Sequence, residues 1–196
     1  MKVLVTGFQP FAGREINVSE EVALRLEATG NFNVRILPVS FKRAFQSVIQ
    51  YLEADDSVDL LVMLGETGTT HDHIRLERVA VNLKDCMTAD SDGDIFDEEP
   101  LIPEAPAAYF TRVPIKRICS MLRNEGHKVK ITNSAGTYVC NSLYYNVLHY
   151  VDRTEKDLEA VFIHLPASQE WVTFDEMERT IIRFIDIYKE IKHFDK

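Results

Sequence analysis

The chain has 196 residues, of which 45% are hydrophobic and 27% charged, and an excess of acidic side chains gives it a formal charge of −9. A chain of this length can bury the core of one domain without disulfides or structural metals. The acidic balance argues against a nucleic-acid partner, because such partners select basic patches. The longest apolar run, Leu60 to Leu64, is too short for a membrane span, and no signal-peptide pattern is visible. We expect one cytoplasmic domain over residues 1–196.

Short apolar runs rich in β-branched residues alternate with stretches of helical periodicity. This alternation is typical of an α/β protein whose sheet is covered by helices on both faces. The predicted strands are Lys2 to Thr6, Asn33 to Leu37, Leu60 to Leu64, Ile74 to Val81, Lys128 to Thr132 and Ala160 to Leu165.

Two helices are predicted in the first two thirds of the chain, one before the third strand and one before the fifth. Apolar residues recur at helical spacing from Phe41 to Leu52 and form one face that can pack on a sheet. A second helix has Pro114 in its first turn and Gly126 as its C-terminal stop.

Two more helices are predicted in the last third of the chain. One follows Cys140, and the other begins at Thr173, which has capping-box spacing to Glu176, and runs almost to the C-terminus. The stretch Asp85 to Ala108 is rich in Asp, Glu and Pro and has no periodicity, so it is predicted to be a long surface loop or a small excursion.

The three cysteines are too far apart in the chain for a zinc site or an obvious disulfide framework. Cys119 lies on the apolar stripe of its predicted helix and is expected in the core, whereas Cys86 stays ambiguous. Cys140 follows a glycine-containing turn and precedes a helix, where free N–H groups and the helix dipole favour a thiolate. Cys140 is therefore either a catalytic nucleophile or a structural cysteine.

A cysteine nucleophile needs a base, and histidine is the usual one. His164 ends an apolar run, at the carboxyl end of a predicted strand, which is the sheet edge where α/β proteins place their sites. His127, His149 and His193 are expected to be structural or solvated. His71 and His73 flank Asp72 and are only a weak metal signal.

One acidic residue lies inside a predicted strand. Glu77 interrupts the run Ile74 to Val81, with Arg78 pointing to the opposite face if the run is a strand. Such a charge is either on a solvated strand face or a buried functional acid, and the pattern does not separate the two.

Four segments carry a more specific signal: Thr6 to Phe11, Glu77 to Asn82, Ser134 to Asn141 and Phe162 to Pro166. In order and spacing they resemble the pyroglutamyl peptidase I (pyrrolidone-carboxylate peptidase) family of cysteine peptidases. The resemblance extends from Met1 to the final helix.

The resemblance implies a phosphorylase/hydrolase-like, three-layer α/β/α sandwich with a mostly parallel, twisted sheet. It also implies a catalytic triad of Cys140 as nucleophile, His164 as base and then acid, and Glu77 orienting His164, with no metal or other cofactor. Such enzymes remove an N-terminal pyroglutamyl residue from peptides through a thioester, and the resemblance suggests a homotetramer.

Because a pyroglutamyl residue carries no charged amine, its pocket needs a small apolar slot and a few hydrogen bonds. Phe8 and Phe11 match aromatic pocket residues of the family, and Asn17 matches the asparagine that supports the pocket. Tyr138 and Val139 are expected in the opposite wall.

The chain departs from the family pattern at several positions. Phe11-Ala12-Gly13 replaces Phe-Gly-Gly, Asn17-Val18-Ser19 replaces Asn-Pro-Ser, residues 65–70 replace Gly-Gln-Ala-Gly-Gly-Arg, and Met87 stands where an arginine is usual. These departures keep two alternatives open: a cysteine hydrolase of altered acyl specificity, or a catalytically lapsed relative that binds a small ligand.

Overall fold

The computed structural model describes residues 1–68, 72–154 and 156–194, and these form a six-stranded sheet of order β2-β1-β3-β8-β4-β7 together with a two-stranded sheet, β5-β6. The strands are β1 (Lys2–Phe8), β2 (Asn33–Leu37), β3 (Val58–Glu66), β4 (Ile74–Glu77), β5 (Val79–Val81), β6 (Ala108–Phe110), β7 (Val129–Thr132) and β8 (Glu159–Leu165). The helices are α1 (Val18–Ala28), α2 (Arg43–Ala54), α3 (Ile115–Asn124), α4 (Val139–Thr154) and α5 (Phe174–Phe194).

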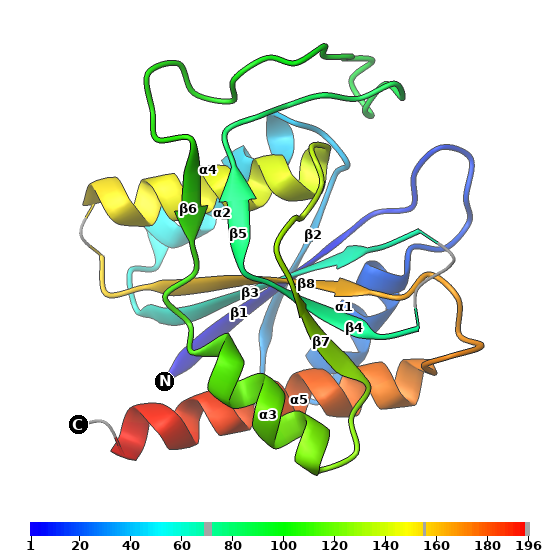
Figure 1. Ribbon diagram of the computed structural model, residues 1–196, viewed down its shortest axis with the longest axis vertical. Coiled ribbons are helices and arrows are strands. Elements are labelled where there is room, and N and C mark those ends of the chain that lie inside the picture. The colour runs from blue at the N-terminus through cyan, green and yellow to red at the C-terminus, as the bar shows by residue number, and fades with distance from the viewer. Residues whose placement is uncertain (69–71, 155, 195–196) are drawn as a thin grey trace.

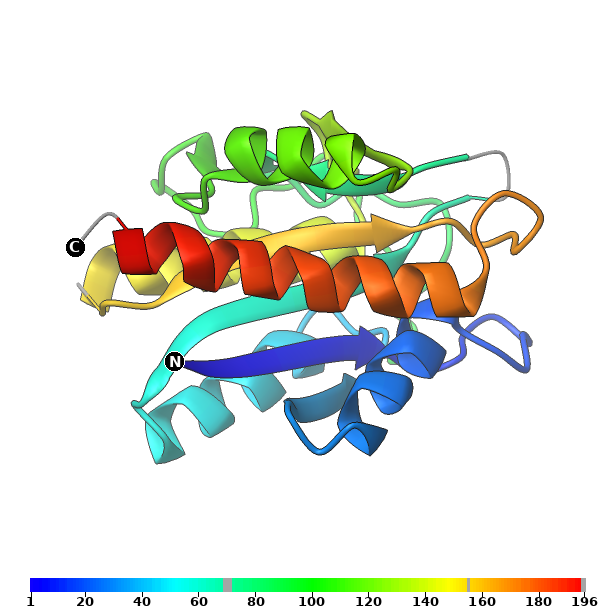
Figure 2. The ribbon, with the colours of Figure 1, turned by 90° about the horizontal axis from the view of Figure 1, so that it is seen from below.

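Helices cover both faces of the main sheet, as Figures 1 and 2 show. The apolar faces of α1, α3 and α5 pack on one side, and those of α2 and α4 pack on the other. The three-layer α/β architecture expected from the sequence is therefore confirmed. Within the described residues, no helix is both long and apolar enough to cross a bilayer.

The direction of the strands is less uniform than the sequence pattern indicates. Strands β2, β1, β3 and β8 are parallel, whereas β4 pairs with β8 in the antiparallel direction and β7 runs parallel to β4. In the register of β4 and β8, Arg75 pairs with His164 and Glu77 with Phe162. The carboxyl ends of β4 and β7 therefore point in the direction opposite to the carboxyl end of β8, so these three strands share no common carboxyl edge.

The predicted strand Ile74 to Val81 is in fact two strands. It breaks at Arg78, whose N–H donates to the Thr132 carbonyl (2.8 Å). After this break β5 leaves the main sheet and pairs with β6, beside α4 (Figure 1).

The stretch Asp85 to Ala108, predicted as a loop or excursion, is tied down by a buried carboxylate. Asp90 is 5% exposed, and it accepts the backbone N–H groups of Phe41 (2.9 Å), Asp92 (2.8 Å) and Asp94 (3.0 Å). The charge of Asp90 is thus balanced by oriented peptide dipoles, and the stretch is held against the segment before α2.

Helix α1 is absent from the sequence prediction. Its buried positions include Ser19 and Ala23 as well as Val22 and Leu26, so its apolar stripe is weak. Its capping signal is clear in retrospect, because the Asn17 side chain accepts the Ser19 N–H (2.9 Å) at the first turn.

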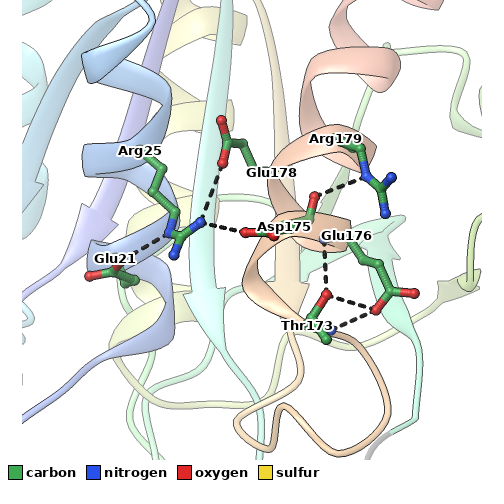
Figure 3. Close-up of polar contacts among 7 residues, drawn as sticks. All are labelled: Glu21, Arg25, Thr173, Asp175, Glu176, Glu178 and Arg179. Carbon is green, nitrogen blue, oxygen red and sulfur yellow. Dashed lines mark hydrogen bonds and ion pairs between the residues drawn. The ribbon is translucent and has the colours of Figure 1, made fainter.

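The start of α5 and the end of α3 lie where the capping signals in the sequence predict them. Thr173 and Glu176 form the predicted capping box at the start of α5, with the Thr173 N–H donating to Glu176 Oε2 (2.7 Å) and the Glu176 N–H to Thr173 Oγ1 (3.3 Å) (Figure 3). At the end of α3, Gly126 adopts a φ of 87°, and the His127 N–H donates to the Leu122 carbonyl (3.0 Å). This is the Schellman geometry that favours glycine.

Helices α1 and α5 are joined at the surface by Arg25. Its Nε donates to Glu21 Oε1 (2.9 Å), and its Nη1 reaches Asp175 Oδ1 (2.7 Å) and Glu178 Oε2 (3.6 Å) (Figure 3). The guanidinium also lies over the Phe174 ring, 5.3 Å from its centroid. Exposed ion pairs of this kind add little stability, so this contact orients two helices whose packing is mainly apolar.

Gly7 sets how closely α1 approaches β1. A Cβ at this position would lie 2.3 Å from the Ser19 carbonyl oxygen. We expect Gly7→Ala to lower the free energy of unfolding by about 2 kcal/mol or more, because backbone has to move. Gly68→Ala, where a Cβ would meet nothing within 4 Å, is the matched control and should cost less than about 0.5 kcal/mol. Urea unfolding curves measure both, and equal losses would contradict this explanation.

Candidate active site

The predicted acid and base are in contact inside the protein. Glu77 has no exposed surface and His164 is 7% exposed. His164 Nδ1 lies 2.9 Å from Glu77 Oε1. The ambiguity over Glu77 is thereby resolved: it is a buried acid and not part of a solvated strand face.

His164 also interacts with Cys140. Because Nδ1 is engaged by Glu77, Nε2 is the ring nitrogen that faces the thiol. Burial alone lowers the pKa of the imidazole, but the hydrogen bonds to Cys140 and Glu77 outweigh it and raise the pKa from 6.5 to about 9. The raised pKa favours the imidazolium form of His164.

Cys140 lies in the first turn of α4, as the sequence predicts. The buried side chain of Asn141 holds this turn against the end of β5 and the chain just after it. It accepts the Val81 N–H (2.9 Å) and donates to the carbonyls of Val81 (2.9 Å) and Leu83 (3.0 Å). Gly65 allows the thiol to approach β3, since a Cβ there would lie 3.0 Å from Cys140 Sγ. The thiol thus sits at the positive end of a helix held firmly in place.

A cavity of about 160 Å³ opens beside the thiol. All five residues predicted to bind substrate line it: Phe8, Phe11, Asn17, Tyr138 and Val139. Its wall also includes Ala12, Arg14, Ile16, Val39 and Glu66. Asn17 has a structural function as well, because it caps α1 and its Nδ2 donates to the Gln9 carbonyl (3.2 Å).

Tyr138 is held in the cavity wall from behind. Its hydroxyl donates to the Ala89 carbonyl (3.1 Å), and its ring packs edge-on against Phe41, with centroids 5.4 Å apart. Phe41 in turn packs on Phe96 (4.9 Å). The acidic stretch after Asp85 therefore buttresses the cavity.

Glu66 brings a negative charge into the cavity wall. Its side chain is only 9% exposed, and both of its oxygens have partners: Oε1 is paired with Arg14, and Oε2 accepts the Val18 N–H (2.9 Å) at the start of α1. An anion is favoured at a helix N-terminus. The carboxylate is thus compensated twice, and the cavity carries no isolated charge. Contact between residues 14 and 66 has no signal in the sequence pattern.

Two further departures from the family pattern have structural counterparts. Ala12 adopts a φ of 54° and Gly13 a φ of 75°, which is the left-handed region where glycine is preferred. Met87 is 99% exposed, so its side chain points away from the cavity. Thr69 and Thr70, at the end of the altered 65–70 segment, and the following His71 lie outside the described residues.

The remaining thiols and histidines have other surroundings. Cys119 is buried in the core as predicted, and burial raises its pKa. The Cys86 Sγ accepts the Phe96 N–H (3.4 Å). His127 contacts Thr180 Oγ1 and His149 contacts the Tyr109 hydroxyl, both at 2.8 Å. In the part of the chain that the structure describes, no three His, Cys, Asp or Glu residues group in a way that could hold a metal ion.

Comparison with known proteins identifies the family. The profile described as pyroglutamyl peptidase matches residues 1–181. The pyrrolidone-carboxylate peptidase of Thermococcus onnurineus (strain NA1) is 40% identical over 173 residues, which is 87% of this chain and 86% of that protein. The pyrrolidone-carboxylate peptidase of Bacillus mycoides (strain KBAB4) is 34% identical and covers 84% of this chain and 77% of its own.

Solved structures agree. The crystal structure of pyrrolidone carboxyl peptidase from the thermophilic keratin-degrading bacterium Fervidobacterium islandicum AW-1 superposes with a TM-score of 0.91 at 31% identity, covering 97% of this chain and 99% of that one. Pyroglutamyl peptidase I of Bacillus amyloliquefaciens gives 0.87 at 29% identity, covering 93% and 94%. The chain belongs to the pyroglutamyl peptidase family of cysteine peptidases.

The raised pKa of His164 has a consequence for stability. A group whose pKa is higher in the folded state stabilises the fold fully below its unfolded pKa, here 6.5, and this contribution is lost as the pH rises through about 9. We expect the wild-type protein to lose stability relative to His164→Gln between these values. Unfolding free energies measured from pH 6 to pH 10 test this, and parallel curves for the two proteins would contradict it.

The ion pair in the cavity wall can be tested by a double-mutant cycle. Arg14→Met leaves a nearly buried carboxylate without its cation and should cost about 1–3 kcal/mol of unfolding free energy. Glu66→Gln can still accept the Val18 N–H and frees an arginine that is 52% exposed, so it should cost less than about 1 kcal/mol. The double variant should resemble Glu66→Gln alone. Additive losses in urea unfolding would show that the two side chains act independently.

Proposed function

We propose that this chain is a cysteine exopeptidase that hydrolyses the bond after an N-terminal pyroglutamyl residue, with Cys140 as nucleophile, His164 as general acid and base, and Glu77 orienting His164. The observation that carries the proposal is the buried contact of Glu77 with His164, next to a thiol that opens into a small aromatic cavity. The names of its relatives support the same reaction.

The first half of the reaction forms an acyl-enzyme. The Cys140 thiolate attacks the acyl carbon of the pyroglutamyl residue, and the backbone N–H groups of the first turn of α4 can stabilise the oxyanion. The peptide C–N bond then breaks while the His164 imidazolium gives its proton to the departing amine. A thioester and a shortened peptide result.

The second half releases the acid. Neutral His164 takes a proton from a water molecule as that water attacks the thioester carbon. The C–S bond breaks, free pyroglutamate leaves, and the thiolate–imidazolium pair is restored. Throughout, Glu77 Oε1 keeps the Nδ1–H oriented and stabilises the charge on the ring.

The size and polarity of the cavity favour this acyl group. Its volume of about 160 Å³ lies below the range of about 300–1,000 Å³ that drug-sized ligands occupy, and suits a single small ring. Phe8 and Phe11 offer apolar surface to an uncharged lactam, and Asn17 is the neutral polar group. Because Glu66 is paired with Arg14, no free carboxylate is available to select an ammonium group.

The proposal extends to the compartment and the assembly. A nucleophilic thiolate has to stay reduced, which suits the cytoplasm, and the cysteines at 86, 119 and 140 are all free thiols. We also propose a homotetramer, as the resemblance to the family implies.

The reaction is tested with a pyroglutamyl aminocoumarin reporter. Cys140→Ser should lower kcat/KM by about 10³-fold or more, because the oxygen nucleophile lacks the thiolate character on which the attack depends. Cys119→Ala, which also removes one thiol but from the core, should retain activity. Wild-type rates in Cys140→Ser would exclude the mechanism.

A panel of reporters with other blocked and free N-terminal residues separates the alternatives. Cleavage of another residue with no cleavage of the pyroglutamyl reporter would indicate altered acyl specificity. Binding of pyroglutamate without any turnover would identify a lapsed relative.

A further inference from the structure

The second oxygen of the buried Glu77 carboxylate has a partner of its own. While Oε1 contacts His164 Nδ1, Oε2 accepts a hydrogen bond from the Thr132 hydroxyl at 2.6 Å. Thr132 is the last residue of β7 and lies directly beside Glu77 in the register of β4 and β7. A short bond from a neutral donor to a buried acceptor indicates a specific pairing.

The backbone fixes the position of this hydroxyl. The Thr132 carbonyl accepts the N–H of Arg78, the residue after Glu77, at 2.8 Å. Thr132 therefore makes two contacts. Its carbonyl holds the chain at the end of β4, and its hydroxyl holds the carboxylate of Glu77. Among the residues that the structure describes, strand β7 is at the edge of the main sheet and pairs within it only with β4. The contact of Thr132 with Glu77 gives this edge strand a direct link to the site.

Orientation of the carboxylate matters because its last torsion is soft. The plane of a glutamate carboxylate rotates about a broad sp³–sp² torsion, and both oxygens of Glu77 are cut off from solvent. A donor on Oε2 restricts this rotation and keeps Oε1 in line with the Nδ1–H of His164. That bond determines which ring nitrogen carries the proton toward Glu77, and leaves Nε2 for Cys140.

We propose that Thr132 is a positioning residue of the catalytic triad, and that its hydroxyl orients the Glu77 carboxylate toward His164. The inference rests on the proposed function, since it assigns Thr132 to the same site. It requires a hydroxyl at this position and not a threonine as such, so serine is a suitable replacement and valine, of the same shape, is not.

The test compares Thr132→Val with Thr132→Ser. We expect Thr132→Val to lower kcat for the pyroglutamyl reporter by about 10-fold or more, the scale typical of groups that orient a functional side chain, with little change in KM. Thr132→Ser should stay within about threefold of wild type. Thr180→Val is the control, because Thr180 is a buried threonine whose hydroxyl is bonded to the Glu176 carbonyl (2.6 Å) on α5, outside the site. It should lower stability without lowering kcat.

A second readout does not depend on the substrate. The rate at which iodoacetamide alkylates Cys140 at pH 7 reports the thiolate–imidazolium pair, and should fall in Thr132→Val but not in Thr132→Ser. If the wild-type protein cleaves no pyroglutamyl reporter, the proposed function fails, while alkylation still tests the role of Thr132. Should Thr132→Val not fold, Thr132→Ala removes the same hydroxyl without burying an extra methyl group.

Two outcomes would overturn the inference. One is a folded Thr132→Val or Thr132→Ala protein with the kcat and alkylation rate of wild type. The other is a Thr132→Ser protein as impaired as Thr132→Val, since the effect would then come from packing and not from the hydroxyl.

Discussion

The contact between Glu77 and His164 is the constraint around which the site is arranged. A carboxylate without exposed surface is costly to bury unless both of its oxygens are hydrogen-bonded, and the structure meets this condition with His164 on one side and Thr132 on the other. The three residues come from β8, β4 and β7, which are neighbours in the sheet. The acid–base pair is thus part of the sheet itself, where rigid backbone determines its geometry more tightly than a loop could.

The reversed direction of β4 and β7 explains why this arrangement is possible. In a fully parallel sheet Glu77 and His164 would both project from strand ends, into a crevice open to water. The antiparallel pairing of β4 with β8 instead puts Glu77 beside Phe162, two pairs inside the sheet relative to His164. The carboxylate is shielded, whereas the imidazole reaches the edge where α4 presents Cys140. The depth of each group therefore matches its proposed role: the acid needs no solvent, and the thiol needs access to substrate.

Much of this could be predicted from local pattern, and what could not depends on contacts between distant residues. Apolar runs and caps predict all six strands of the main sheet and four helices, including the capping box at Thr173, because these signals act over a few residues. Helix α1 was missed because Ser19 and Ala23 interrupt its apolar face. Strand direction has no signature in periodicity, so the burial of Glu77 stayed undecided. The partnership of Arg14 with Glu66, like that of Thr132 with Glu77, is set by tertiary packing alone.

The cavity also shows how a glutamate can replace a neutral residue of the family pattern without leaving an unpaired charge in the wall. A glutamate in the wall would repel a developing oxyanion if its charge were unbalanced. Here one of its oxygens meets the α1 N-terminus and the other meets Arg14, and both partners lie within the loop and helix that follow β1. Glu66 lies at the end of β3, and its bonds to Arg14 and to the Val18 N–H therefore tie the end of β3 to the loop that contains Phe11. That loop also includes Ala12 in a left-handed conformation, which a non-glycine residue adopts only when its surroundings hold it. The Glu66–Arg14 pair supplies such a constraint, so two departures from the family pattern are coupled through one segment of chain.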